Sequence, residues 1–272
     1  MPQANAATNP SEKEIASALR IDRGQNGVVT LTLNRPHVKN AIPGDLWEPL
    51  EQIFRDIRET ESDRVLVITG AGGAFCAGAE LGGNMVNGGH PLDAMHAVNA
   101  AALALHTLTK PTLAKVGGDA VGAGMNLALG CDLVVAGESA RFSEIFARRG
   151  LSVDFGGTWL LPRLIGMHKA KELSLLAEIL SADEARDLGL VNRVVPDNAL
   201  DAFVDDWAQR LANGPPLALQ MTKRMLSNSL TMSFSQALDA EGWAQTVNFG
   251  SEDTLEGVKA FVEKRPPKFK GR

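Results

Sequence analysis

The sequence predicts an α/β fold with a largely buried sheet, because strand-like and helix-like segments alternate along the chain as far as Val195. Gly27–Asn34 alternates apolar and polar residues with a period of two, which is typical of a half-buried strand. Val65–Thr69 is a short apolar run, as expected of a strand buried on both faces, and Thr112–Val116 alternates like a short strand.

Helical segments separate these strands. Leu46–Thr60 carries apolar residues at helical spacing, and Pro91–Thr109 begins with proline, which suits the first turn of a helix. Between the two helices, the Gly-rich stretch Gly82–Gly89 is expected to be a mobile loop. Leu133–Ala136 is expected to be a further strand.

The later part of the chain is expected to be mainly helical. Glu184–Leu188 is a short predicted helix and Val191–Val195 a last strand. The predicted helices beyond are Ala199–Ala212, Pro216–Ser227, Ser233–Gly250 and Asp253–Lys264. Residues 1–17 are small and polar and are expected to be disordered, residues 18–195 to form the core, and residues 196–272 a helical region of the same folding unit.

Val116–Asp132, which reads V-G-G-D-A-V-G-A-G-M-N-L-A-L-G-C-D, is interpreted as a strand, a tight turn and a buried helix that stops at Gly130. The first N–H groups of a helix are unpaired and carry the positive end of its dipole. With only small residues at 122–124, an oxygen of a ligand can approach them closely. Taken alone, a glycine turn that only permits close packing explains the stretch equally well.

A second small-residue loop favours the ligand-binding interpretation. Gly70–Leu81, G-A-G-G-A-F-C-A-G-A-E-L, also follows a predicted strand. Two such loops can direct two N–H donors at one oxygen, which is the arrangement of an oxyanion hole.

At these loops the sequence resembles the crotonase, or enoyl-CoA hydratase/isomerase, superfamily, and the resemblance covers essentially Ile21–Arg272. Its further motifs are L-N-R-P-H-V-K-N-A at Leu33–Ala41, G-G-T-W-L-L-P-R-L-I-G at Gly156–Gly166, A-x-x-x-G-L-V-N-R-V-V at Ala185–Val195 and E-G-V-K-A-F-V-E-K-R at Glu256–Arg265. The resemblance implies a spiral of strand-strand-helix repeats, with a C-terminal helical region that forms a homotrimer or a dimer of trimers. It also implies an acyl-CoA substrate, with coenzyme A as part of that substrate and no separate cofactor.

The resemblance also assigns residues to the site. The oxyanion donors would be the N–H groups of Ala79 and Ala123. Positions implied to line the acyl-CoA site are Ala77, Gly78, Glu80, Leu81, Gly122, Gly124, Asn126, Phe146 and Trp159, among which Glu80 is interpreted as structural. Val38 and Lys39 would lie near the nucleotide of coenzyme A, and Phe261 and Lys264 would reach the nucleotide of a neighbouring subunit.

The acid–base positions depart from the hydratase pattern. Hydratases of this superfamily carry two Glu residues that share one water, and the corresponding positions here hold Asn126 and Phe146. Neither side chain exchanges a proton at working pH, which places hydratase chemistry in doubt. Glu144 would take the second Glu position only if the match to the superfamily motif were shifted by two residues, and the surrounding motif disfavours that shift.

Asp154 falls where dienoyl-CoA isomerases and phenylacetate-pathway epoxide isomerases hold a functional Asp, and that branch is the nearest one. Its apolar neighbours Val153, Phe155 and Trp159 would raise its pKa and suit it to carry a proton. The competing interpretation is a helix N-cap. The sequence therefore predicts an acyl-CoA isomerase. The alternatives are an enoyl-CoA hydratase, an enzyme that uses Asp154 as a nucleophile and a non-catalytic acyl-CoA-binding protein.

Composition excludes several other classes. With 272 residues, a net charge of −5 and a pI of about 5.6, the chain is not expected to bind nucleic acid or an anionic membrane. Its two cysteines favour reduced thiols in a cytoplasmic protein, and no targeting segment is expected. The histidines do not pair at metal-binding spacing, and the glycines lack the dinucleotide-binding spacing.

Overall fold

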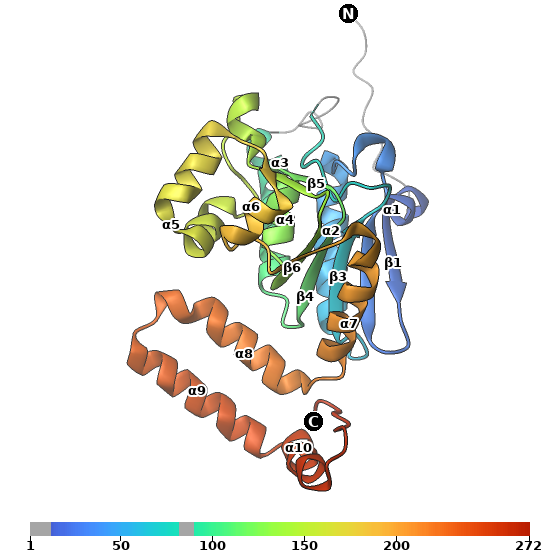
Figure 1. Ribbon diagram of the computed structural model, residues 1–272, viewed down its shortest axis with the longest axis vertical. Coiled ribbons are helices and arrows are strands. Elements are labelled where there is room, and N and C mark those ends of the chain that lie inside the picture. The colour runs from blue at the N-terminus through green and yellow to red at the C-terminus, as the bar shows by residue number, and fades with distance from the viewer. Residues whose placement is uncertain (1–11, 82–89) are drawn as a thin grey trace, which may run out of the picture.

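A six-stranded sheet forms the centre of the computed structural model, which describes residues 12–81 and 90–272 (Figure 1). The strand order is β1-β2-β3-β4-β6-β9, and only the pairing of β1 with β2 is antiparallel. The strands are β1 (Leu19–Arg23), β2 (Val28–Leu33), β3 (Val65–Gly70), β4 (Thr112–Val116), β6 (Leu133–Gly137) and β9 (Arg193–Val195). The predicted α/β class is confirmed; Gly82–Gly89 lies outside the described residues.

Both faces of this sheet are covered. On β3, Leu66 and Ile68 belong to the main core cluster, whereas Val65 and Val67 pack in a second cluster with α7 (Leu200–Ala212). Helices α2 (Trp47–Glu59) and α3 (Pro91–His106) pack against each other and contribute to the main core. Burial on alternating faces explains why β3 reads as a continuous apolar run.

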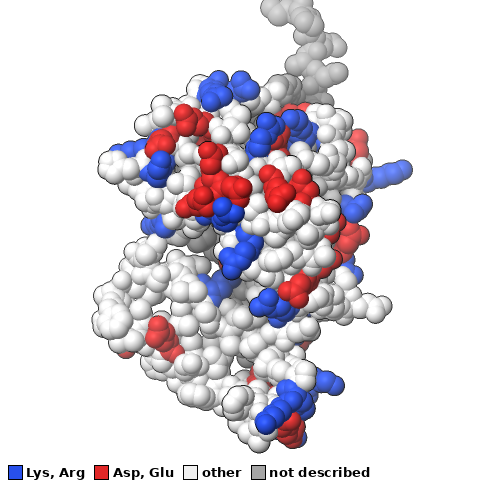
Figure 2. Space-filling view, in the orientation of Figure 1, with Lys and Arg blue, Asp and Glu red and all other residues white. Residues whose placement is uncertain are grey.

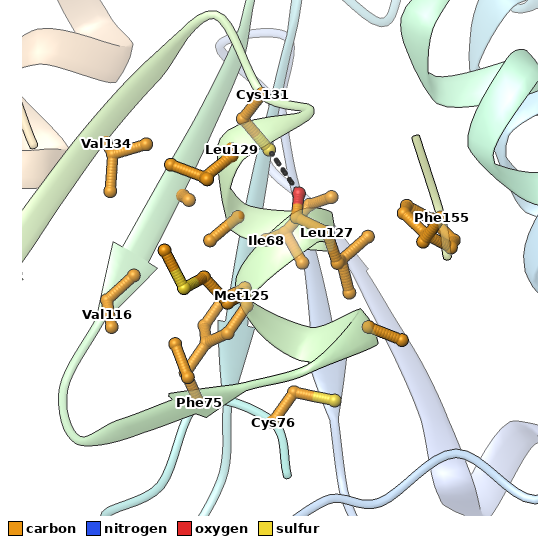
Figure 3. Packing of buried hydrophobic residues seen from close by; sticks show 14 of the residues in the cluster. Ile68, Phe75, Cys76, Val116, Met125, Leu127, Leu129, Cys131, Val134 and Phe155 are labelled. Carbon is orange, nitrogen blue, oxygen red and sulfur yellow. Dashed lines mark hydrogen bonds between the residues drawn. The ribbon is translucent and has the colours of Figure 1, made fainter. Parts of the chain in front are cut away.

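A second, smaller sheet supports the central helix. It consists of β5 (Asp119–Val121), β7 (Arg141–Ser143) and β8 (Leu180–Ser181). Every residue of α4 (Ala123–Leu129) is buried, and Figure 3 shows side chains of α4 among those of surrounding strands and loops. The sequence reading missed β5, β7 and β8, because two or three residues are too few for a periodic pattern.

Six further helices complete the described part of the chain. They are α1 (Glu12–Ala18), α5 (Gly157–Leu176), α6 (Ala182–Asp187), α8 (Pro216–Asn228), α9 (Phe234–Phe249) and α10 (Glu252–Glu263). Short 3-10 turns are η1 (Pro36–Val38), η2 (Gly44–Leu46), η3 (Ile145–Arg149), η4 (Asp197–Ala199) and η5 (Ser229–Thr231). The expectation of disorder as far as residue 17 is wrong for residues 12–17, which belong to α1, and residues 1–11 lie outside the described part.

Helices α8, α9 and α10 extend away from the sheet, and the chain ends beside α10 (Figure 1). Many apolar side chains on them are exposed, including Phe234, Trp243 and Phe261. Figure 2 shows charged side chains gathered mainly over the α/β body, whereas the visible surface of α8 and α9 is mostly uncharged. Over the described ranges, no helix combines the length and apolarity needed to cross a bilayer.

Candidate active site

The two small-residue loops lie against each other in the structure. The N–H groups of Phe75 and Cys76 both donate to the oxygen of Asp119, at 3.0 and 2.9 Å, and Val121 N–H donates to the oxygen of Cys76 at 2.9 Å. These bonds fasten the loop after β3 to strand β5, which leads directly into α4. The two loops predicted from the sequence therefore meet at the start of α4.

Glycine at position 78 permits this close approach. Its φ is +90°, and a Cβ placed on it would lie 2.8 Å from the oxygen of Val121 and 3.3 Å from the nitrogen of Ala123. A Cβ on Gly124 would lie 2.2 Å from the oxygen of Cys76. A side chain at either position would push the loops apart, because real Cβ atoms essentially never approach so closely.

The N–H groups of Ala79 and Ala123 border this contact. Within the described residues neither N–H donates a hydrogen bond, whereas Glu80 N–H donates to Ile42 at 2.9 Å and Gly122 N–H to Ser143 at 2.8 Å. Ala123 is the first residue of α4, so its N–H belongs to the positive end of the helix dipole. Both groups can therefore donate to an oxygen of a ligand.

One turn further along α4, Asn126 connects two carboxyl-bearing segments. The Asn126 side chain is fully buried, and its Nδ2 donates to the backbone oxygen of Asp154 at 3.0 Å and to Oε2 of Glu144 at 3.4 Å. A Cβ on Gly157 would lie 2.4 Å from this Nδ2, so the start of α5 also packs closely on the amide. Asn126 thus holds Asp154 and Glu144 beside the helix that begins at Ala123.

The backbone after Asp154 adopts an unusual conformation. Phe155 has φ 48° and Gly156 has φ 82°, so two consecutive residues lie in the left-handed region. For a bulky residue such as phenylalanine this conformation is costly and persists only when packing enforces it. Phe155 is buried against Trp47, with ring centroids 5.6 Å apart. The packing of Phe155 therefore fixes the position of Asp154.

Asp154 does not cap the following helix. The N-cap of α5 is Gly156, and no side chain caps this helix. Instead, Oδ1 of Asp154 is buried and has no hydrogen-bond partner among the described residues. Burial raises the pKa of Asp154 to about 6. The carboxyl group is therefore poised to exchange a proton near neutral pH.

Glu144 lies at this site without any register slip, which the sequence reading did not anticipate. It follows β7 directly, and only 1% of its surface is exposed. Burial, the largest effect, and the nearby charge of Asp154 raise the pKa of Glu144 to about 8, although the hydrogen bond from Asn126 opposes the shift. Phe146 is also buried, with its nearest ring atom 3.6 Å from a Cβ position on Gly122.

A second carboxyl therefore lies in the cluster that sequence reasoning assigned to Asp154 alone. The sequence signal that could have identified Glu144 is the polar pair Ser143-Glu144, which directly follows the apolar residue Phe142. By the superfamily motif this pair lies two residues out of register, and only the structure places Glu144 beside Asn126.

Other predicted residues surround the loops. Arg35 donates to Glu80 and to the oxygen of Ala41, both at 2.7 Å, consistent with a structural Glu80. Lys39 is exposed and pairs with Asp119 at 2.9 Å. Trp159, in the first turn of α5, is partly exposed, with the Arg163 guanidinium 3.9 Å from its ring centroid.

The remaining predicted residues differ in exposure. Val38 in η1 and Ala77 are half-buried, and Leu81 is exposed. Phe261 and Lys264 are exposed at the end of α10, which lies away from the α/β body that contains α4 (Figure 1). Within one chain the structure does not bring them to the loops. In the described part of the chain, no group of three His, Cys, Asp or Glu side chains could hold a metal ion.

Comparisons with known proteins agree with this geometry. Residues 23–272 match the family model described as enoyl-CoA hydratase/isomerase. The chain is 37% identical to a 1,2-epoxyphenylacetyl-CoA isomerase of Escherichia coli, with 91% of this chain and 97% of the relative covered. It is 36% identical to a 2,3-dehydroadipyl-CoA hydratase of the same organism, with 94% of this chain and 100% of the relative covered.

Solved structures give the same result. An enoyl-CoA hydratase from Bacillus anthracis superposes with a TM-score of 0.88 at 34% identity, and the match covers 94% of this chain and all of that one. An enoyl-CoA hydratase from Mycobacterium smegmatis gives 0.85 at 34% identity, over 93% of this chain and 98% of that one. The chain belongs to the enoyl-CoA hydratase/isomerase family and has the crotonase fold.

Proposed function

We propose that this member of the enoyl-CoA hydratase/isomerase family is an isomerase that moves a proton between two carbons of an acyl-CoA with Asp154. The observation that carries the proposal is the Asp154 carboxyl, which has a buried, unpartnered oxygen and a pKa raised to about 6 by burial. The two positions at which hydratases of the superfamily carry Glu hold Asn126 and Phe146 instead.

In the proposed reaction, the thioester oxygen accepts hydrogen bonds from the N–H groups of Ala79 and Ala123. Ionised Asp154 removes a proton from the carbon next to the thioester carbonyl of a 3-enoyl-CoA, and the enolate that forms carries its negative charge on that oxygen. Donors that are already in place stabilise this charge without reorganising. The neutral Asp154 carboxyl then returns the same proton to a different carbon, so the double bond shifts and Asp154 is ionised again.

The pKa of Asp154 suits both halves of this reaction. A base with an ordinary Asp pKa would bind the abstracted proton weakly, whereas a group with a pKa near the working pH takes up and releases a proton with similar ease. The E. coli relative whose name describes an isomerase supports the same class of chemistry.

Hydration of a 2-enoyl-CoA is the second candidate, because Glu144 provides a carboxyl beside Asp154. In that case ionised Asp154 would take a proton from water as the oxygen adds to one carbon, and protonated Glu144 would deliver a proton to the neighbouring carbon. The E. coli relative named as a hydratase keeps this candidate open.

Turnover of paired substrates distinguishes the two functions. A 3-enoyl-CoA and the matching 2-enoyl-CoA are each incubated with the wild-type protein and with Asp154→Asn. The two isomers, which have the same mass, are separated by liquid chromatography, and water addition is identified by the gain in mass. We expect the wild type to interconvert the two thioesters faster than it adds water. We expect Asp154→Asn to lower the isomerisation rate about 10²–10⁴-fold, because it removes the base but keeps the shape.

The matched control is Asp201→Asn, which alters an exposed carboxylate that pairs with Lys115 on the α7 side of the sheet. It should leave turnover unchanged. Water addition that outpaces isomerisation would identify the chain as a hydratase. Isomerisation that survives in Asp154→Asn would rule out Asp154 as the base.

A further inference from the structure

The Glu144 carboxyl is enclosed without a compensating positive charge. Within the described residues its one hydrogen bond comes from Nδ2 of Asn126 at 3.4 Å, and no Lys, Arg or His side chain is paired with it. A carboxylate in such a place has lost its hydration and gained little in return, so the neutral acid is the favoured form.

The hydrogen-bonding inventory of the site leads to the same conclusion. Four buried side-chain atoms have no partner among the described residues, namely Oδ1 of Asn126, Oγ of Ser143, Oε1 of Glu144 and Oδ1 of Asp154. With both carboxyls ionised, three of these atoms could only accept hydrogen bonds. The Ser143 hydroxyl is then the one donor among these four atoms against three acceptors, and a proton on Glu144 supplies a second donor.

The charged groups on neighbouring elements do not change this balance. Helix α4 carries no titratable residue, and Arg141 on β7 is exposed and pairs with Asp119. Arg148 and Arg149 lie in the last turn of η3, with exposed side chains. Asp154 is the charged group that acts on Glu144, and its influence opposes a second negative charge.

We propose that Glu144 holds a proton in the cluster with Asn126 and Asp154 and acts as a positioning residue for the base. Neutral Glu144 fixes the Asn126 amide, and this amide in turn holds the backbone of Asp154. Asp154 then carries the negative charge of this three-residue cluster. This inference rests on the proposed isomerase function for its kinetic consequences, but not for the protonation state itself.

Two substitutions separate a neutral hydrogen-bonding group from an ionised one. Glu144→Gln keeps the size and polarity of the neutral acid, whereas Glu144→Met keeps the volume and removes the polar atoms. For Glu144→Gln we expect kcat and KM close to wild type at pH 7. For Glu144→Met we expect kcat to fall about 10–100-fold with little change in KM, because Asp154 is no longer held in place.

The pH dependence of the rate distinguishes a protonated Glu144 from a Glu144 that only stabilises the fold. The wild-type rate should fall as pH rises through about 8, because ionised Glu144 opposes the negative charge of the enolate. Glu144→Gln should lose this fall. Glu138→Gln, at an exposed position after β6, is the matched control and should keep it.

A measurement on the free protein tests the protonation state without any substrate. The infrared spectrum of the wild type should contain a protonated-carboxyl C=O band that persists at pH 7, disappears near pH 8 and is absent from Glu144→Gln. If no such band distinguishes the two proteins, or if Glu144→Gln is as slow as Glu144→Met, the proposal is overturned. If the wild type shows this infrared band but has no isomerase activity, Glu144 is protonated as proposed and only the proposed isomerase function is wrong.

Discussion

The side-chain amide of Asn126 donates a 3.0 Å hydrogen bond to the backbone oxygen of Asp154, which lies 28 residues further along the chain. Asn126 lies one helical turn after Ala123, so the helix that offers the proposed oxyanion donor also holds the proposed base. Phe155, which follows Asp154 in the chain, has a left-handed backbone conformation, and its buried ring also fixes the position of Asp154. A residue at the hydratase acid–base position has thus become a structural link between the two halves of the site.

Breaking this link should affect both rate and stability. Asn126→Leu keeps the volume but removes the donor shared by Asp154 and Glu144. We expect kcat to fall about 10–100-fold, because small displacements of a reacting group are costly. We also expect a loss of about 1–3 kcal/mol in the free energy of unfolding, because buried acceptors lose their partner. Steady-state kinetics and urea denaturation measure the two effects. Wild-type kcat in a folded variant would contradict the link.

Asp154→Asn should stabilise the protein at neutral and alkaline pH. Burial raises the pKa of Asp154 from its usual 3.8 to about 6, so the folded state favours the protonated form. The stability that Asp154 contributes is therefore fully present below about pH 4 and is lost as pH rises through about 6. At pH 8 we expect the variant to be more stable by up to about 3 kcal/mol, with the difference vanishing near pH 3. Denaturation at both pH values checks this, and a pH-independent difference would contradict it.

The sequence identified the strands and helices that carry the two loops, because their apolar spacing and glycine positions are local signals. It predicted α2, α3 and the C-terminal helices to within a few residues. It missed β5 and β7, whose three residues each pair only through the tertiary fold. It also missed the helical turn at Glu12–Ala18, where a polar composition was read as disorder.

Glu144 illustrates why the site itself was only partly predictable. Family motifs assign roles by position along the chain, and by position Glu144 is two residues away from the functional one. Burial beside Asn126 depends on the change from strand β7 to the 3-10 turn η3, which begins at Ile145. No pattern recognised in the sequence indicated that change.

The pH dependence of kcat/KM should report Asp154 in the free enzyme. Because Asp154 must be ionised to accept a proton, kcat/KM is expected to rise tenfold per pH unit below about pH 6 and to level off above it. Initial rates with a 3-enoyl-CoA at constant ionic strength measure this limb. An inflection near the ordinary Asp value of about 4 would show that Asp154 is not desolvated in the working enzyme.

The exposed apolar surface of the C-terminal helices favours association with other copies of the chain, and the family resemblance makes a homotrimer or a dimer of trimers the expected assembly. Trp243 on α9 is 75% exposed and Phe261 on α10 is 84% exposed, which is unusual for large apolar side chains. We expect Trp243→Glu to shift sedimentation from trimer toward monomer. It should also weaken binding of coenzyme A thioesters, because Phe261 and Lys264 are expected to serve a neighbouring subunit. Gln245→Glu, at an exposed polar position of α9, is the control. A wild-type protein that is a stable, active monomer would refute this assembly.

The oxyanion hole can be tested at Ala123 by removing one N–H with little damage to the helix. Ala123 is the first residue of α4, where proline is well tolerated, and it follows Gly122, which is free to adopt the backbone that proline requires. We expect Ala123→Pro to lower kcat about 10²–10³-fold, the usual effect of losing one such donor.

Ala182→Pro places proline at the same position of α6, on another buried alanine, and should leave kcat unchanged. Circular dichroism confirms folding of both variants. If folded Ala123→Pro keeps the wild-type rate, the Ala123 N–H does not bind the thioester oxygen, and the oxyanion hole must be built from other donors.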